Sequence, residues 1–541
     1  MERKALNNRS PFSGEPPKPE PSGSWTPQEK WVWEQVVSGN VADFNNSNGY
    51  GGDLDPRKPE GWIPNRQLRR RFLEAILLTE PYRSAVTRKG VHIEGAWFDE
   101  PLDLIAAIIN FNFLLVRCRF ACYVSMAHVK TAGTLSFAGS KFENTLILNG
   151  ARIGIDLLMR NEGEFGNVEL KSTEVGSHLD LSSSKFVGTL NMNSIRVKGM
   201  LAMRSGAEFA EIDLVGAEVT SDIDMQRARF KGVLSMNGLK AERVDLSEST
   251  FEKAVLLDSF HAQSHVVIQS ATFSDSAPIV MDFASIGANL DFSGSMLASV
   301  TLIGANVRGS LIFGQEDRGD QTPYDVRWQS GAKLSLSNAS IGALQDLESA
   351  WPNELDLKGF TYGYLGGFGT DRTTNMAMRD VPWLKGWLEK QKAFSPSPYV
   401  QLASALVNAG YRENANEILY AGRERERMET GLSLRSNLWL SLMKIFIGYG
   451  YRLQYSIYWV LLFVVLGVVA LQFSGQGFAG GLRDDFFYSV DMLLPIVDLD
   501  KRFSEFNVIG WAKYYFYIHK TMGYILASFI IAGLSGLTSS H

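Results

Sequence analysis

The feature that most constrains the fold is an apolar repeat with a period of eleven residues, which begins at Leu102. A large apolar residue recurs at each step, and a second one follows two positions later. The first residues of these pairs are Leu102, Phe113, Val124, Leu135, Leu146, Leu157, Val168, Leu179, Leu190, Leu201, Ile212, Ile223 and Leu234. A short fixed period of this length predicts a solenoid, in which each unit stacks on its neighbours.

Each repeat contains the alternation of a short strand. The residue between the two apolar ones is often polar, as at Asp180 and Asp224, so two side chains should point inward and one outward. A small residue and then a large apolar one follow, as at Ser184 and Phe186. Apolar spacings of 2, 5, 7 and 11 do not form one face of a helix. We therefore expect strands, with Asp180 and Asp224 as surface residues on one outer face.

Neighbouring repeats alternate in character, as "NGARIG" and "AGSKFE" do, so two repeats predict one coil of 22 residues. The predicted fold is mainly β: a right-handed parallel β-helix with α-helical caps and two C-terminal transmembrane helices. The second half of each repeat resembles the pentapeptide repeat. The expected segments are a disordered N-terminus at 1–25, a helical cap at 26–89, the solenoid at 90–360, a helical hairpin region at 376–432, and an interfacial helix with two membrane spans at 433–541.

The expected N-terminal cap begins with a clear helix signal. Thr26 and Glu29 form a capping box around Pro27. A second helix is predicted from Asn65 to Leu78, and its four arginines (Arg66, Arg69, Arg70 and Arg71) are interpreted as solvated surface. The preceding residues are rich in Pro, Ser and charge and have no apolar core of a signal peptide, so we expect no secretion signal.

Composition and motifs predict neither catalysis nor a bound group. The net charge of −5 does not favour nucleic acid as a partner. Cys118 and Cys122 are too few for a metal site or a disulfide framework. His261 and His265 are interpreted as structural, and the sequence 475–480 matches G-x-G-x-x-G without the βαβ unit that a dinucleotide site needs. We therefore predict no catalytic, cofactor-binding or metal-binding residue.

The C-terminal part predicts two membrane spans. Residues 455–473 carry no charge, and 19 helical residues match a bilayer core of ~30 Å. The second span is expected at 517–537, where Ser528, Ala532 and Gly536 would form a small-residue face for helix packing. Residues 434–452 are predicted to form an amphipathic interfacial helix.

Basic residues precede the first span, and they predict that the large N-terminal body is cytoplasmic. They are Arg423, Arg425, Arg427, Arg435, Lys444 and Arg452. The loop between the spans also carries Arg and Lys residues, so the asymmetry is incomplete. The predicted location is the bacterial inner membrane, with more than one pass.

The segment between the spans is semi-apolar and too short to cross a bilayer. A helix from Asp484 to Leu494, stopped by Pro495, would suit a re-entrant or interfacial element. Its layout resembles the pore region of two-span cation channels, in which Asp491, Asp498 and Asp500 could form a charged ring. The segment lacks the glycine-bearing filter of that family, and an anchoring or packing role is favoured over a pore.

Two sequence motifs carry a wider resemblance. "PYVQLASALVNAGYRENA" at 398–415 resembles one tetratricopeptide-type hairpin, expected to serve as an adaptor or cap, with peptide binding as the alternative. Together with "LLPIVDL" at 493–499, the solenoid and the spans, it resembles predicted bacterial membrane proteins over 31–536. Some members of that group are labelled membrane-associated oxidoreductase, but this chain carries no flavin, nicotinamide or haem motif.

These features predict a non-enzymatic, membrane-anchored scaffold or sensor. Its expected partners are membrane lipid, further copies of the chain through the spans, and a protein at the solenoid or the hairpin. The finer hypothesis is an oligomeric, channel-like pore gated by a cytoplasmic partner. The alternatives are a membrane-disrupting antiphage effector and, from the family label alone, a membrane-associated oxidoreductase.

Overall fold

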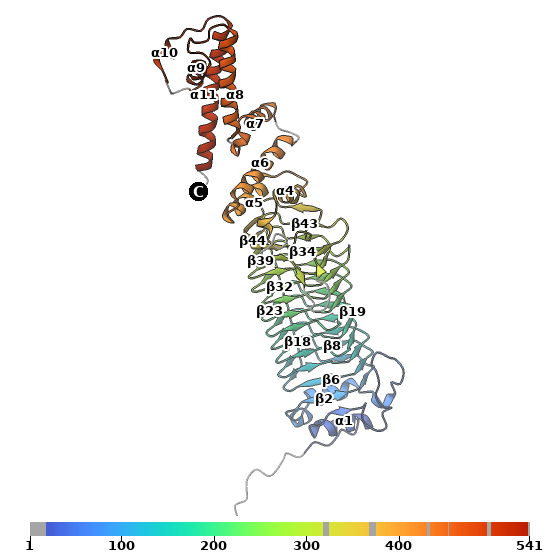
Figure 1. The fold of residues 1–541 in the computed structure, drawn as a ribbon. Helices are drawn as coiled ribbons and strands as arrows, with labels where there is room; N and C mark the ends of the chain where they lie inside the picture. The colour runs from blue at the N-terminus through green and yellow to red at the C-terminus, as the bar shows by residue number, and fades with distance from the viewer. Residues whose placement is uncertain are drawn as a thin grey trace, which may run out of the picture. The chain divides into compact units, whose positions relative to one another are not determined.

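The computed structural model describes residues 18–316, 324–366, 375–429, 433–452, 454–494 and 499–538 (Figure 1). Side chains are described throughout these ranges except at 315–316, 324, 504 and 532–538. The chain divides into two compact units, Met1–Met378 and Arg379–His541.

The first unit is a parallel β-solenoid of about 12 turns, which confirms the solenoid prediction. Strands pair in register with strands 22 residues away: Leu135 lies opposite both Phe113 and Leu157. Each coil adds two short strands to each of two long parallel sheets. One coil consists of β5 (Ile108–Ile109), β6 (Phe113–Val116), β7 (Arg119–Phe120) and β8 (Val124–Ser125). The handedness of the coils stays a prediction.

The irregular end of the repeat forms the last coils. A short antiparallel pair, β40 (Gln315–Glu316) and β41 (Tyr324–Asp325), stands where the polar insertion interrupts the period. The final strands are β43 (Lys333–Ser335), β44 (Ser340–Asp346), β45 (Glu354–Asp356) and β46 (Thr361–Leu365). They continue the two sheets, so the insertion leaves the stacking intact.

The solenoid core is a column of stacked side chains. From Phe98 to Phe273, buried phenylalanines of successive coils stack on one another along one sheet, with ring centroids 4.2 Å apart at Phe120–Phe142 and 4.6 Å apart at Phe251–Phe273. The equivalent position in the other sheet is mostly aliphatic, as at Val175 and Val197. This difference between the two sides of a coil explains why neighbouring repeats alternate in character.

Polar side chains inside each repeat hold the turns between strands. Asp180 Oδ1 accepts a hydrogen bond from the Ser182 amide at 3.0 Å, and Asp224 Oδ1 accepts one from Gln226 at 3.1 Å. These Asx turns precede a residue with positive φ, such as Ser183 (φ 56°). Asp180 and Asp224 do lie two coils apart on one face, as expected. Both side chains are only partly exposed, and their turn bonds show that they have a structural role.

The cap consists of short helices and a wrapped loop. Its elements are α1 (Pro27–Val37), β1 (Ala42–Asp43), η1 (Pro64–Arg66), α2 (Arg70–Leu78) and α3 (Tyr82–Ala85). The capping box at Thr26 and Glu29 is present. β1 pairs with β2 (Val91–Glu94), so the first coil has no open edge at this point.

The interpretation of the four arginines as solvated surface is wrong for Arg66. Arg66 is fully buried, and it donates hydrogen bonds to Asn45 Oδ1 at 2.7 Å and to the carbonyl oxygens of Tyr50 at 2.6 Å and Gly95 at 3.1 Å. The wrapped loop supplies Asn45 and Tyr50, and the turn after β2 supplies Gly95. Sequence spacing does not reveal these acceptors. The helix also starts later than expected, because Gln67 is extended and bridges to Trp97.

The second unit is helical. Its elements are α4 (Val381–Glu389), α5 (Pro396–Asn408), α6 (Arg412–Met428), α7 (Leu434–Ile447), η3 (Gly448–Gly450), α8 (Gln454–Phe473), α9 (Leu482–Leu493), α10 (Lys501–Glu505) and α11 (Trp511–Thr538). Helices α5 and α6 pack as a hairpin, and α9 packs against both α8 and α11. Glycine permits this close packing: a side chain at Gly467 would collide with Ser489, and one at Gly523 would collide with the backbone of Leu493.

Candidate membrane-interaction site

Helix α8 has the length and composition of a membrane span. It is 20 residues long with a mean hydropathy of 2.3, and it is the one helix in the described part of the chain that meets both criteria. Only 28% of its most apolar window is buried within the protein. A buried helix of a water-soluble core would hide most of that surface. The second predicted span lies within α11 and stays a prediction.

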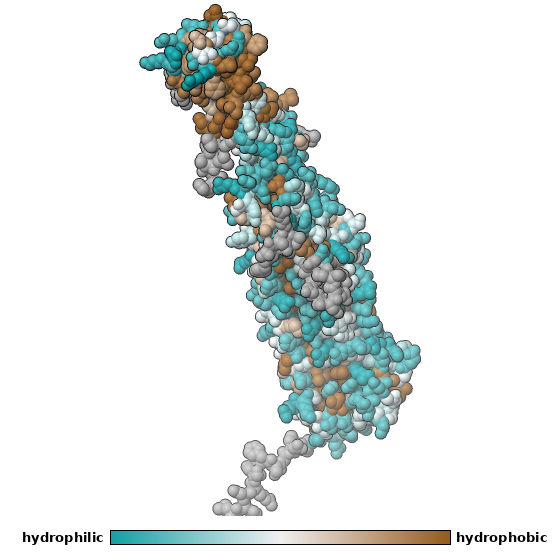
Figure 2. Space-filling model, viewed as in Figure 1, coloured by the Kyte–Doolittle hydropathy of each residue, from teal (hydrophilic) through white to brown (hydrophobic). Residues whose placement is uncertain are grey.

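The apolar side chains of α7, α8 and α11 face outward. Figure 2 shows hydrophobic surface gathered over these helices. The exposed apolar belt comprises Leu434, Leu438, Trp439, Leu442 and Ile445 of α7; Ile457, Tyr458, Leu461, Leu462, Val465, Leu466, Val469 and Phe473 of α8; and Trp511, Tyr514, Tyr517, Ile518, Tyr524, Ile525 and Ile531 of α11. Contiguous apolar surface on this scale indicates an interaction with a membrane or a partner.

The same helices bury polar groups between them. Ser489 of α9 is fully buried, and its hydroxyl donates to the carbonyl oxygen of Val464 at 2.9 Å. His519 of α11 is also fully buried, with Nε2 donating to the Ser489 carbonyl at 3.0 Å and Nδ1 lying 3.2 Å from the Tyr515 hydroxyl. These bonds tie α8, α9 and α11 together. The distribution of polarity is therefore inverted relative to a water-soluble bundle.

A third buried polar residue, Asp485, holds the loop after α8. Asp485 is fully buried and accepts hydrogen bonds from the Phe478 amide at 2.8 Å and from the Gln472 side chain. Sequence reasoning missed both Asp485 and Ser489. Their spacing of four residues, which places them on one face of α9, was the available signal.

The predicted pore residues are engaged within one chain where the structure describes them. Asp491 is buried, and its carboxylate accepts the Leu499 amide at 2.5 Å. Asp500 caps α10 and pairs with Arg502 at 2.6 Å. Pro495 and Asp498 lie outside the described residues. The charged ring between subunits stays a prediction.

The predicted helix-packing face lies on α11. Ser528 is exposed, and its hydroxyl donates to the Tyr524 carbonyl at 2.8 Å on the same helix. Ala532 and Gly536 belong to α11, but their side chains fall outside the described set. Assembly through this face stays a prediction.

A cluster of charges, called here the junction cluster, joins α6 to the segment before α8. Glu424 accepts hydrogen bonds from Arg427 at 2.5 Å, Lys444 at 2.9 Å and the Tyr449 hydroxyl at 3.0 Å. Burial alone would raise the pKa of Glu424, but these donors outweigh it and lower the pKa to about 2.

A second ion pair supports the same junction. Arg452 pairs with Glu417 at 2.8 Å, and its guanidinium lies 4.3 Å from the centre of the Tyr420 ring. Four of the basic residues that predicted the orientation are bound to glutamates of α6: Arg423, Arg427, Lys444 and Arg452. Acidic residues count little in the positive-inside rule, so the predicted orientation is unchanged.

The cysteines and the glycine motifs show no chemical site. Both cysteines are free thiols, and burial raises the pKa of Cys118 to about 12, so this thiol is unreactive. Within the described ranges no group of three His, Cys, Asp or Glu side chains could hold a metal ion. The segment 475–480 follows a helix rather than a strand.

Comparison with known proteins gives no family for this chain: no family model, curated protein or solved structure matches it. The resemblance to predicted bacterial membrane proteins therefore stays an expectation.

Proposed function

We propose that this protein is a membrane-anchored scaffold, in which α8 and α11 enter the bilayer and the β-solenoid offers a docking surface in the cytoplasm. The observation that carries the proposal is the inverted polarity of the second unit. Val465 and Phe473 are exposed on α8, whereas Ser489 and His519 are fully buried. Exposed apolar side chains are compatible with contact to lipid, and polar side chains are favoured away from it, inside the helix bundle.

Helix α7 supports a position at the membrane surface. Leu438 and Trp439 are exposed on it, and Lys444 on its last turn is bound to Glu424. An apolar face next to a polar connection suits a helix that lies in the headgroup region. The junction cluster would then hold the α5–α6 hairpin to the membrane-entry segment.

Carbonate extraction and cysteine labelling of the full chain test this proposal. The protein should stay in the membrane pellet at high pH. In a Cys122→Ser background, Ile509→Cys should react with an impermeant maleimide added outside spheroplasts, and Lys253→Cys on the solenoid should react only after lysis. Buried Cys118 should give little background. Release by carbonate would contradict the anchor, and the reverse labelling would contradict the orientation.

A conducting assembly is the second candidate, and the packing of α9 against both α8 and α11 favours it. This is the helix, short helix, helix order of a pore unit. Purified protein in planar bilayers should then show single-channel currents that Asp491→Asn alters. Silence with every partner that binds the protein would leave the scaffold as the function.

A further inference from the structure

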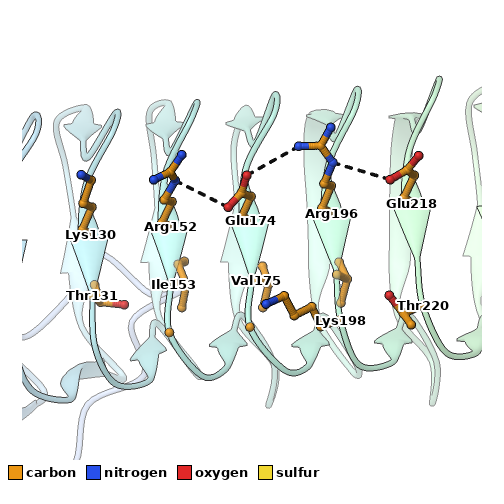
Figure 3. Close-up of a pocket in the computed structure, with 13 residues that line it drawn as sticks. Lys130, Thr131, Arg152, Ile153, Glu174, Val175, Arg196, Lys198, Glu218 and Thr220 are labelled. Carbon is orange, nitrogen blue, oxygen red and sulfur yellow. Dashed lines mark ion pairs between the residues drawn. The ribbon is translucent and has the colours of Figure 1, made fainter.

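A groove of about 520 Å³ runs along one sheet of the solenoid, beside a row of charged side chains (Figure 3). The row lies on β9 (Lys130–Thr131), β13 (Arg152–Ile153), β17 (Glu174–Val175), β20 (Arg196–Val197) and β23 (Glu218–Val219). Arg196 bridges Glu174 at 3.5 Å and Glu218 at 3.6 Å. Arg152 approaches Glu174 at 3.5 Å. We call this row the groove ladder.

Two neighbouring glycines keep the groove open. Gly154 and Gly176 occupy the same position in successive coils, where Lys198 and Thr220 stand in the next two. A Cβ atom at Gly154 would collide with the carbonyl oxygen of Ala132, and one at Gly176 would collide with that of Gly154. Any side chain is therefore excluded at both places. Figure 3 shows Lys198 reaching back toward the coil of Val175, along the space that the glycines leave.

The groove carries an excess of positive charge. Its lining contains four basic residues (Lys130, Arg152, Arg196 and Lys198) and two acidic ones (Glu174 and Glu218), which gives a net charge of +2. Among the side chains that the structure describes, Lys130 and Lys198 have no carboxylate within ion-pair distance, whereas Arg152 and Arg196 share Glu174. Two cations thus face the groove without a counter-charge.

The other sheet provides an internal comparison. Positive and negative residues follow one another in the same order along its equivalent strands, which begin with β7 and β11 (Lys141–Phe142). From β7 to β25 (Arg229–Phe230), the cations of this second ladder have carboxylate partners: Arg119, Lys141, Lys185, Arg229 and Lys231 pair with Glu143, Glu164, Glu208, Glu252 and Glu208. Lys231 occupies the position that corresponds to Lys198 and binds Glu208 at 2.6 Å. Unpaired positive charge is therefore a property of the groove ladder rather than of the repeat.

We propose that the groove binds an extended acidic segment of a partner protein. Four steps of ~4.8 Å separate Lys130 from Glu218, so about six residues of extended chain would span the groove. Carboxylates of such a segment would meet Lys130 and Lys198, and its backbone would lie over the two glycines. Charge complementarity of this kind selects the partner and speeds its association. The proposal rests on the scaffold function, since it names the partner class that the solenoid docks.

Fluorescence anisotropy with the detergent-solubilised full chain tests this binding. The probe is a labelled hexaglutamate peptide, and the controls are hexalysine, polyphosphate and single-stranded RNA. Hexaglutamate should bind, weaken with added salt, and lose about fivefold in affinity with Lys198→Ala, as one exposed ion pair predicts. The matched variant Lys231→Ala should leave the affinity unchanged. Lys130→Glu combined with Lys198→Glu should abolish binding.

Two results would contradict the proposal that the groove binds an acidic segment. One is an equal loss with Lys198→Ala and Lys231→Ala, which would mean that the peptide meets the solenoid without a preferred site. The other is tighter binding of polyphosphate or RNA than of hexaglutamate. Membrane extraction of the same variants keeps the two proposals separate: a normal pellet fraction without peptide binding would reject the groove alone.

Discussion

The solenoid and the helical unit bury different kinds of side chain. The solenoid buries aromatic rings, whereas the helical unit exposes some of them and buries polar groups. In the solenoid, Phe186 is buried and stacks between Phe165 and Phe209, with centroids 5.0 and 5.2 Å away. In the helical unit, Phe473 is 82% exposed and Ser489 is 0% exposed. The solenoid and helix α8 thus differ in which side chains they bury, as the proposed membrane anchor requires.

The difference also concerns what holds each unit together. Apolar burial in water stabilises the solenoid, because every coil removes its inward side chains from solvent. In the proposed membrane anchor that driving force would be absent, and close packing at small residues and hydrogen bonds would replace it. Gly467 and Gly523 provide the close approach, and the Ser489–His519 bond provides the polar contact.

The largest expected effect is on the solenoid core. Phe186→Ala should lower the free energy of unfolding by about 3–5 kcal/mol, because it opens a cavity in the stacked column. Phe473→Ala in α8 should change it little, since this ring is exposed. Urea unfolding in detergent, followed by circular dichroism at a β-sheet wavelength, measures both. Equal losses would contradict the idea that the two units face different solvents.

An aspartate introduced on the exposed surface of each unit tests more directly whether that surface faces lipid or water. Val465 in α8 and Val187 in β19 (Lys185–Asn191) are 57% and 58% exposed. Val465→Asp should cost about 2.5–3.5 kcal/mol of membrane insertion, as an aspartate at the centre of a span does. Val187→Asp should be nearly neutral. The pellet fraction after carbonate extraction reports the difference, and unchanged retention of Val465→Asp would reject α8 as a span.

The repeat allowed the solenoid to be predicted because its signal recurs in every coil. Leu135 can pair with Phe113 and Leu157 only if the period is constant, and one period then determines the register of the whole stack. The long apolar helix α8 was equally accessible, since residues 455–473 carry no charge. The burial of Arg66 was not accessible, because its acceptors come from the wrapped loop and from the turn after β2, which meet only in the assembled cap.

The candidate site shows the same limit. Ser489 and His519 are 30 residues apart in sequence, and their hydrogen bond depends on how α9 and α11 pack. The groove also depends on assembly: Lys130 and Lys198 become neighbours of one cavity only after the coils stack. Features carried by one segment were predicted, and features built from several were not.

The junction cluster should respond to pH only in strong acid. Glu424 has a pKa of about 2, below its ordinary value of 4.5, so its stabilising effect is complete above 4.5 and is lost as the pH falls through 2. Hydrogen exchange in α7 should therefore be similar at pH 7 and pH 5 and should speed up below pH 4.5. The rate of hydrogen exchange itself depends on pH, so the variants described next are compared with the unchanged protein at the same pH.

At neutral pH, removal of the Glu424 charge by substitution should have the same effect as protonation of Glu424 in strong acid. Glu424→Gln should lower the protection of α7 by about 2 kcal/mol, the range for hydrogen bonds to a charged group. Glu426→Gln is the control, because Glu426 pairs with Arg423 on its own helix at 2.8 Å. Equal protection in the two variants would show that α6 and α7 are held by other contacts.

The smallest expected effect lies in the turns of the solenoid, where the repeat forces ordinary residues into a left-handed conformation. Ser172 has φ 53°, which costs an L-residue about 1–2 kcal/mol. Ser172→Gly removes that strain but adds backbone freedom to the unfolded chain, worth about 0.5–1 kcal/mol. The net result should be a gain of roughly 0.5 kcal/mol in the free energy of unfolding. Thr250→Gly in β29 (Thr250–Phe251) should instead lose about the same amount, because a strand residue has no such strain to relieve. Opposite signs in urea unfolding would show that the turn geometry, rather than glycine itself, determines the outcome.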